Sequence, residues 1–550
     1  MIAEPNHAAT SGPPRSRILR ADARLSLPFP AAERWLAPLY ATMAIGFVLI
    51  GAGNLDLGPA DARLGIAAGE PFGPIGQVFG RYAPELWPAK VALSRLAGLF
   101  VERGDAAPGI VHWPSALAAA AIGWMLARRA AATLGTRTGI FVGLAWLASV
   151  GAIDHSGAVG LDFVTGLAVV AAIDRLLDEG SDWTAGAWTA LAFLAGGWPP
   201  AIVVLLVVIV LGRPEAGYSA RLFVPPAVAA AAWAAWAIAS ATPEGMAAAL
   251  VLPFKHRPDW FMALTLLGLA LPFGPFAALA WSPSVRRGWT PGGGLLIKGW
   301  TQAALACLVA GTVVPGISQA ARIPALAGMM IASGTVLEAA WTGSLSRWSR
   351  RAFLAAAFGL SLLWLMSLVY GEYLWLMVFS YYRPVGIAAA VVAVPLIALA
   401  WSGAELGNSR RATVALVLLA ASLKLVHWGY YVPEANYRYG QGPWGRAIGQ
   451  WVLPNWTIHT FHDWPPELAF ATGRPVRQLP APLHIAYPQD GESRHVLLLQ
   501  SEFENWPESA PRLIKVASFQ ELDGSVRVLA RTPGKLVAPS GLALPGRAED

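Results

Sequence analysis

Apolar residues run along this chain in long blocks that are separated by short polar or basic connections. A helix needs roughly 20 apolar residues to cross the hydrocarbon core of a bilayer. About thirteen blocks approach that length, so the pattern predicts an all-α polytopic membrane domain with about 13 transmembrane helices. The predicted helices are 37–53, 113–131, 138–153, 157–174, 184–197, 199–212, 222–242, 260–281, 298–315, 323–341, 352–370, 384–402 and 412–430.

Basic residues mark alternate connections between these blocks. Cytoplasmic loops are enriched in Lys and Arg, so we expect the N-terminus and every second connection to lie in the cytoplasm. The opposite face then receives a long first loop, residues 54–112, a second segment, 242–259, and everything after about residue 431. The expected cytoplasmic basic residues are Arg128, Arg129, Arg137, Arg175, Arg213, Arg221, Arg286, Arg287, Arg347, Arg350, Arg351, Arg410 and Arg411.

The last part of the chain, residues 431–550, differs from the rest because charged residues return. Short runs at 495–500, 513–516 and 525–529 are rich in strand-forming residues, and turn residues such as Asp523 and Gly524 separate them. About 120 residues can form one small domain. We therefore predict a small α/β extracytoplasmic domain after the membrane domain, residues 37–430.

The composition agrees with a membrane protein. Of 550 residues, 55% are hydrophobic and only 13% are charged, whereas soluble domains carry roughly a quarter charged residues. The first 36 residues are polar and basic, with no signal-peptide cleavage pattern, so the first block is interpreted as a signal anchor. The net charge of +7 is explained by the basic connections, and nucleic acid is not an expected partner. The single cysteine, Cys307, cannot form a disulfide within the chain.

Several classes of protein are disfavoured by missing motifs. The sequence has no Walker P-loop, no Gly-rich dinucleotide turn, and no HExxH or paired-Cys metal motif. Nucleotide-driven work inside the cell is therefore not expected. No matching pair of broken helices marks an inverted transporter repeat.

The first outer loop concentrates charged groups that could act on a ligand at the membrane surface. Asp56 and Asp61 closely follow the first helix, and Arg81, Glu85 and Lys90 stand among aromatic residues and prolines. Each charge alone is equally consistent with a solvated loop. Together they offer acids for proton abstraction or metal binding and bases for an anionic ligand.

Other charges of the same face come from later segments. Asp162 lies in an apolar block, where an ionisable group needs a cavity or a partner, such as Arg63 or His155, or else a helix end that lets it reach water. The planar guanidinium of Arg257 matches phosphate oxygens, and Arg322, at the start of a later helix, is a second candidate. Anchoring at the membrane interface explains these two arginines equally well.

Seven short segments share their order and spacing with one family. They are Pro59-Ala-Asp-Ala-Arg63, Arg81-Tyr-Ala-Pro-Glu85-Leu-Trp-Pro88, His112-Trp-Pro-Ser-Ala116, Gly160-Leu-Asp162, Gly197-Trp-Pro199, His256-Arg-Pro-Asp-Trp-Phe261 and, resembling a strand motif of the outer domain, Leu468-Ala-Phe-Ala-Thr-Gly-Arg-Pro475. In these segments the chain resembles the GT-C membrane glycosyltransferases, especially the branch that holds protein O-mannosyltransferases and the lipid A aminoarabinose transferase.

The resemblance implies transfer of a sugar, with inversion, from a polyprenyl-phosphate-linked donor to a lipid, glycan or protein acceptor at the outer face of a bacterial inner membrane. It implies catalytic roles for Asp61, Asp56 and Asp162, with Glu85 and His155 beside them in the pocket. The residues expected to hold the donor phosphate are Arg63, Arg81, Lys90, His256, Arg257 and Arg322. No metal ligand is assigned, although Glu85 and His256 could approach a divalent ion.

The sequence departs from the family pattern at the main acidic position. Ala60 stands where the family has its principal aspartate, and Asp61 falls on the neighbouring glutamate position. This favours one alternative, a catalytically impaired GT-C-like protein that serves as a structural or regulatory partner in a membrane complex. A transporter for a lipid-linked glycan is a further alternative, which would need more charges near the bilayer midplane.

Overall fold

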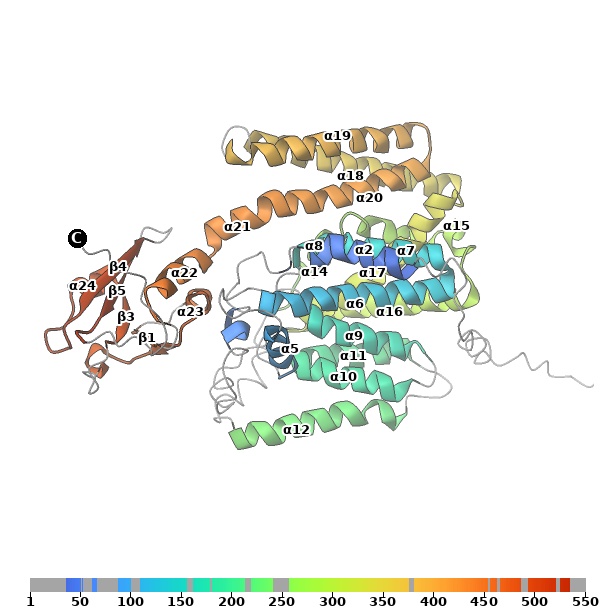
Figure 1. Ribbon diagram of the computed structural model, residues 1–550. Helices are drawn as coiled ribbons and strands as arrows, with labels where there is room; N and C mark the ends of the chain where they lie inside the picture. The colour runs from blue at the N-terminus through green and yellow to red at the C-terminus, as the bar shows by residue number, and fades with distance from the viewer. Residues whose placement is uncertain are drawn as a thin grey trace, which may run out of the picture. The chain divides into compact units, whose positions relative to one another are not determined.

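The computed structural model of the chain folds into two compact units. The helical unit comprises Met1–Ala52, Phe72–Leu93 and His112–Tyr431, and the tail unit comprises Gly53–Pro71, Ser94–Val111 and Val432–Asp550. Figure 1 shows the helical character of the first and the strands of the second. The structure describes residues 36–50, 52, 62–66, 88–99, 109–155, 162–178, 181–212, 219–240, 257–374, 380–453, 456–461, 465–485, 493–520 and 525–534.

Every predicted apolar block coincides with helical structure in the described residues. The corresponding elements are α2 (Leu36–Ala44) with η2 (Ile45–Leu49), α6 (Gly109–Leu134), α7 (Thr136–Leu147) with α8 (Val150–His155), α9 (Phe163–Leu176), α10 (Asp182–Gly196), α11 (Trp198–Leu211), α12 (Val224–Ser240), α14 (Met262–Leu269) with η8 (Gly274–Trp281), α16 (Pro291–Val313), α17 (Ser318–Thr342), α18 (Arg347–Tyr373), α19 (Arg383–Glu405) and α20 (Ser409–Val426). Shorter elements join them, namely α5 (Pro88–Gly98), η6 (Ala220–Leu222), α15 (Pro283–Arg286), η10 (Ser380–Tyr382) and the π-helix η11 (His427–Tyr431).

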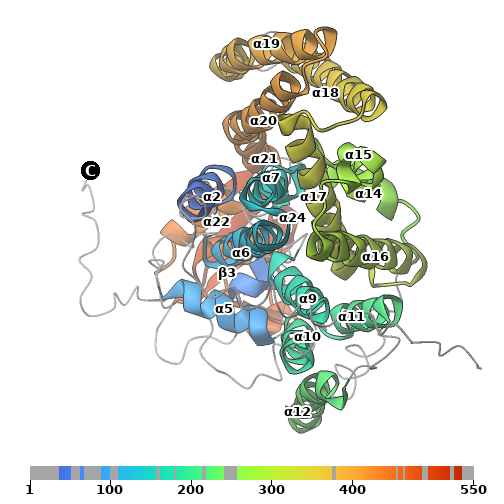
Figure 2. The same cartoon turned by 90° about the vertical axis from the view of Figure 1, so that its right-hand side faces the viewer.

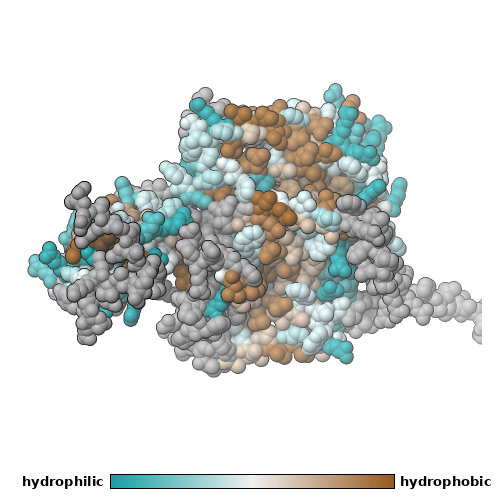
Figure 3. All heavy atoms as spheres, viewed as in Figure 1, coloured by the Kyte–Doolittle hydropathy of each residue, from teal (hydrophilic) through white to brown (hydrophobic). Residues whose placement is uncertain are grey.

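The helical unit has the surface of an integral membrane protein. In the described residues, five helical segments are long and apolar enough to cross a bilayer, or six if the bent pair α14–η8 is one span. Large apolar side chains such as Leu363, Met366 and Val391 are more than half exposed. Figure 3 shows a broad hydrophobic band across this unit, with hydrophilic residues gathered toward the helix ends. Contact of such an apolar surface with lipid tails is favourable, whereas its contact with water is not.

Two predicted helices are broken in the structure. The block 260–281, expected as one helix, forms α14 and η8, which meet at an angle of 99°. Pro272 lies in the break and cannot supply the N–H that a continuing helix needs. The block 138–153 is divided at Ser149, whose hydroxyl accepts a hydrogen bond of 3.2 Å from the Ala152 N–H and so begins α8.

Small residues allow the central helices to pack closely. Added Cβ atoms at Gly328 and Gly334 of α17 would lie 2.7 Å from the Trp300 carbonyl oxygen of α16 and from the Val142 nitrogen of α7. Such close backbone approach is how helices pack in membranes, where burial of apolar surface gives little driving force. Figure 2, which looks along the helices, shows α17 among α7, α16 and α9.

The tail unit contains a mixed five-stranded sheet in the order β2-β1-β3-β5-β4. Strands β1 and β2 and strands β1 and β3 pair in parallel, whereas β3–β5 and β4–β5 are antiparallel. The predicted small α/β domain and its three strand runs are therefore confirmed. The elements are α21 (Val432–Tyr439), α22 (Gly442–Gln450), β1 (Ile458–Thr460), α23 (Pro466–Thr472), β2 (Val476–Gln478), η12 (Pro482–His484), β3 (His495–Leu499), α24 (Gln500–Glu504), β4 (Ile514–Gln520) and β5 (Val526–Arg531).

One expectation for the tail was wrong. The segment 468–475 resembles a strand motif, yet residues 468–472 belong to helix α23, which ends at Gly473 with a φ of 59°. Only Gly adopts this left-handed conformation at little cost. Helix α23 packs closely against residues 62–66 of the predicted first loop. The contact leaves no room for a side chain at Gly65, where an added Cβ would lie 2.4 Å from the Phe470 ring.

Candidate functional site

The structure describes only some of the predicted site residues. Asp56, Asp61, Arg81, Glu85 and His256 lie outside the described residues, as does the side chain of His155. Arg63 belongs to the tail unit, on the short helical segment 62–66, and is exposed. The roles of these seven residues stay predictions.

Two predicted residues form a close ion pair in the helical unit. The Lys90 ammonium lies 2.6 Å from Oδ2 of Asp162, and the Lys90 side chain is only 5% exposed. The described partner of Asp162 is thus Lys90, which was not among the partners predicted for it. A lysine this deeply buried must be paired, because an isolated charge away from water is very costly.

Asp162 also determines how α9 begins. Its carboxylate accepts hydrogen bonds from the Thr165 N–H, at 3.2 Å, and from the Thr165 hydroxyl. It is the N-cap of α9 and not an interior residue, so the predicted helix 157–174 starts later than expected. Its φ of 43° is the one positive value at a non-glycine position among the described residues. Such strained conformations persist where the surrounding contacts enforce them, often at functional sites.

A second acid–base pair joins α8 to the end of α20. Nε2 of His427 lies 3.1 Å from Oδ1 of Asp154. A carboxylate can only accept at that position, so Nε2 is the donor, and in the neutral tautomer Nδ1 is the nitrogen with the lone pair. Nδ1 is buried and has no hydrogen-bond partner in the described part of the chain. His427 lies in the π-helix η11 and stacks on Tyr431 at 5.3 Å.

Sequence reasoning missed His427 as a site residue. It falls in the run His427-Trp-Gly-Tyr-Tyr431, which has the composition of an aromatic anchor at a membrane interface. The available signal was a Lys and a His at positions 424 and 427, in the last turns of an otherwise apolar block. In the structure the charge of Asp154 acts on the Lys424 ammonium as well.

The two predicted phosphate-binding arginines outside the first loop have different surroundings. Arg322 of α17 donates a hydrogen bond of 2.9 Å to Oδ2 of Asp259, which ties the start of α17 to the segment before α14. Arg257 is exposed. The acidic partner of Arg322 suits a structural anchor, and a phosphate would have to displace it.

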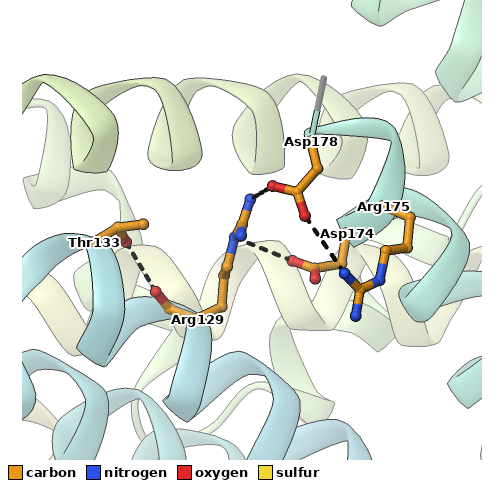
Figure 4. A network of polar contacts seen from close by, with 5 residues as sticks. All are labelled: Arg129, Thr133, Asp174, Arg175 and Asp178. Atoms are coloured by element: carbon orange, nitrogen blue, oxygen red, sulfur yellow. Dashed lines mark hydrogen bonds and ion pairs between the residues drawn. The ribbon is translucent and has the colours of Figure 1, made fainter. Parts of the chain in front are cut away.

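A different set of charges lies at the opposite end of α9. Arg129 of α6 forms an ion pair with Asp178 and lies 3.7 Å from Asp174, while Arg175 lies 3.6 Å from Asp178 (Figure 4). The Thr133 hydroxyl donates to the Arg129 carbonyl oxygen at 2.9 Å. Arginine stays protonated in proteins, so the positive charge that joins α6 to α9 is always present.

Metal ligation is not supported within the described residues, where no three His, Cys, Asp or Glu side chains come together. Chemically, the helical unit offers a buried ammonium that can receive an anion and an imidazole that can receive a proton. Figure 1 draws α5, α8 and the C-terminal end of α20 at the same end of the helical unit. Lys90 lies in α5, Asp154 lies in α8, and His427 directly follows α20 as the first residue of η11.

Comparison with known proteins gives one consistent result. No protein-family model matches the chain, and no curated protein sequence matches it. Among solved structures, the chain is similar to ArnT from Cupriavidus metallidurans bound to undecaprenyl phosphate, with a TM-score of 0.65 and 16% sequence identity. That similarity covers 91% of this chain and 98% of the ArnT chain. The apo state of the same ArnT gives a TM-score of 0.64 and 15% identity over the same shares. The fold is therefore that of the GT-C membrane glycosyltransferases, as the sequence motifs predicted.

Proposed function

We propose that this chain, which has the GT-C membrane glycosyltransferase fold, transfers a sugar from a polyprenyl-phosphate-linked donor to a lipid, glycan or protein acceptor. The observation that carries the proposal is the match to ArnT along 91% of the chain, in a structure that holds undecaprenyl phosphate. A fold alone does not determine an activity. The proposal therefore also depends on residues of this chain that can serve such a donor.

Lys90 is the residue best suited to the donor phosphate. Its ammonium is buried, and its carboxylate partner in the described residues is Asp162. A phosphate that enters beside it would share or replace this partner, and the charge-assisted hydrogen bonds would hold the donor. When the bond between the anomeric carbon and the phosphate oxygen breaks, the same ammonium stabilises the negative charge on the departing polyprenyl phosphate.

His427 is the residue best suited to the acceptor proton. Asp154 holds the imidazole in the tautomer whose Nδ1 can accept a proton, which is how a carboxylate supports a histidine base. The acceptor hydroxyl would attack the anomeric carbon from the face opposite the phosphate, with inversion. Its proton would pass to Nδ1 of His427. Ala60 removes the main acid of the family pattern, and His427 supplies a base from a different helix.

The first-loop residues complete the proposal as predicted from the sequence. Asp61 and Asp56 would orient the acceptor or share the work of the base. Within the helical unit, Arg81 of this loop, together with His256 and Arg257 of the segment before α14, would surround the donor phosphate. The alternative of a catalytically impaired partner protein was favoured by Ala60, and the Asp154–His427 pair weakens it by offering a base elsewhere.

The proposed topology places this chemistry outside the cytoplasm of a bacterial cell. We propose that the thirteen helical segments cross the inner membrane with the N-terminus inside and the tail unit in the periplasm. The arginine network around Arg129 would then face the cytoplasm, in agreement with the positive-inside rule. Protease added to spheroplasts should remove only the chain beyond about residue 431. Removal of the tail from inverted vesicles would reverse the assignment.

The decisive experiment measures both binding and transfer. Purified protein in maltoside micelles is titrated with undecaprenyl phosphate and then supplied with undecaprenyl-phosphate-linked pentoses and hexoses. Lys90→Gln should weaken binding of undecaprenyl phosphate roughly 10- to 100-fold, as expected for one charge-assisted contact. Lys298→Gln, at an exposed lysine of α16, is the matched control and should bind normally. Equal binding by both variants would refute the role of Lys90. If the wild-type protein transferred sugar from none of the donors, the proposed transferase activity would be refuted.

A further inference from the structure

A group of basic side chains gathers on one face of the tail sheet, apart from the residues used above. His459 in β1 is paired in register with Arg477 in β2 and with Val496 in β3. Paired residues of parallel strands point to the same face, and residues two apart on a strand do so as well. Arg494 stands two residues before Val496. His459, Arg477 and Arg494 therefore share one face of the sheet.

His459 is buried and incompletely satisfied. It is 8% exposed, and its Nδ1 atom is buried without a hydrogen-bond partner in the described residues. Burial, with the positive charges of Arg494 and Arg477, lowers the pKa of the His459 imidazole from 6.5 to about 4. The described charges that act on this ring are both positive, so an arriving anion would meet a consistently favourable field.

Arg494 is held in place through its backbone, and the described residues supply neither arginine with an acidic partner. The Arg494 N–H donates to the Thr532 hydroxyl at 2.9 Å, and the Ser493 hydroxyl donates to the Thr532 carbonyl oxygen at 2.9 Å, which fixes this corner against the end of β5. In the part of the chain that the structure describes, no acidic side chain forms an ion pair with Arg477 or Arg494. The Arg474 side chain, by contrast, donates hydrogen bonds to the Val452 and Gly449 carbonyl oxygens.

We propose that His459, Arg477 and Arg494 form a binding site for a phosphate group on the tail unit. Two planar guanidinium groups can each offer paired N–H donors to a phosphate, and a protonated imidazole adds another. Three donor groups on one face match the three terminal oxygens of a phosphate monoester better than the two of a carboxylate. The group could be the headgroup of an anionic lipid or a soluble phosphate, since the chemistry recognised is the same.

The test measures protonation of His459 in the full-length protein. Exchange of the imidazole C2 hydrogen for deuterium, followed by mass spectrometry across a range of pH, reports the pKa of each histidine. In maltoside micelles, we expect inorganic phosphate to raise the pKa of His459 from about 4 toward 6.5, because the anion favours the charged imidazole. Arg477→Gln and Arg494→Gln should each abolish most of this response.

The control is Arg512→Gln, which removes an equal charge from an exposed position of the same unit and should leave the response intact. An unchanged pKa of His459 at saturating inorganic phosphate would overturn the site. A response that survives both Arg477→Gln and Arg494→Gln, or one that Arg512→Gln also removes, would overturn it as well. None of these readouts depends on sugar transfer.

A second arm separates the two sources of phosphate. Protein in phosphate-free buffer is placed in phosphatidylcholine nanodiscs with or without phosphatidic acid. A pKa of His459 that rises only when phosphatidic acid is present would identify a lipid headgroup as a ligand of the site. A rise with inorganic phosphate in micelles, and none with phosphatidic acid, would identify the site as one for soluble phosphates.

Discussion

The two ends of α9 carry charges of similar number but of different chemical character. At one end, Arg129 joins α6 to Asp174 in the last turn of α9 and to Asp178 just after it, and an arginine neither loses a proton nor easily changes partners (Figure 4). At the other end, the cation beside Asp162 is Lys90, and in a separate pair Asp154 of α8 holds His427. Lysine and histidine are the residues that exchange protons and anions. The identity of the cation therefore indicates whether an ion pair holds helices together or can take part in binding and proton transfer.

The largest effect should follow from removing the proposed base. His427→Gln should lower the rate of transfer from an undecaprenyl-phosphate-linked sugar by about 10²- to 10⁴-fold, the usual value of a general base. The glutamine amide cannot accept a proton, so the residual rate of the variant should depend on pH differently from the wild-type rate. His484→Gln, at an exposed histidine of the tail, is the control. A variant with the wild-type pH–rate profile would show that another group is the base.

The opposite end of α9 should respond in stability and not in rate. Arg129→Ala leaves Asp174, which is 5% exposed, without its nearest cation and should destabilise the helical unit by up to about 3 kcal/mol. Thermal unfolding of the purified protein measures the loss, with Arg128→Ala at the exposed neighbour as the control. Transfer per folded molecule should not change. A large fall in that rate would erase the proposed distinction between the two ends.

A conservative exchange tests the identity of the cation directly. Lys90→Arg keeps the positive charge and can keep the ion pair with Asp162, so the fold should be preserved. The bulkier guanidinium is a poor substitute for a buried ammonium point charge, and transfer should fall by roughly 10-fold, or about 1.4 kcal/mol. Arg129→Lys should leave transfer unchanged. If Lys90→Arg had no effect on the rate, charge alone would matter at this position.

The tail unit provides a reference, a buried histidine that has no carboxylate partner among the residues that the structure describes. His495 is 2% exposed, and burial with the nearby positive charge of Arg531 lowers its pKa from 6.5 to about 4. As the pH falls below 6.5, the unfolded tail binds a proton that the folded tail does not, so stability is lost toward acid. Between pH 7 and 5.5 the loss should be on the order of 1 kcal/mol.

Exchange of the tail-sheet amides, corrected for the intrinsic pH effect, measures this loss. His495→Phe, which keeps a ring beside Trp456, should make the tail less sensitive to acid. Equal acid sensitivity in the variant and the wild type would show that other groups control it.

Much of the fold follows from local features of the sequence. Apolar blocks of bilayer length were expected to be helical and are helical, because chain in a membrane must satisfy its own backbone hydrogen bonds. The runs at 495–500 and 525–529 became β3 and β5. The misjudged places are breaks, such as Pro272, and the segment 468–475, where a family motif suggested a strand and the chain forms α23.

The candidate site was only partly visible in the sequence. Lys90 and Asp162 stand out because ionisable residues are rare near apolar blocks, and each was identified separately. Their pairing was not visible, since 71 intervening residues and several helices separate them. His427 was hidden among aromatic residues that anchor helices at interfaces. Its importance depends on Asp154, which is distant in the chain and adjacent only after folding.

Consecutive residues were enough to predict a bundle of membrane helices followed by a small sheet domain, and short motifs indicated the GT-C fold. The length of an apolar block and the alternation of residues in a strand are properties of consecutive residues, so no tertiary contact is needed to recognise them. The tertiary structure decided which charges meet. A carboxylate becomes a helix cap, an anchor or the support of a base through the side chains that packing brings to it, and packing joins residues from distant parts of the chain.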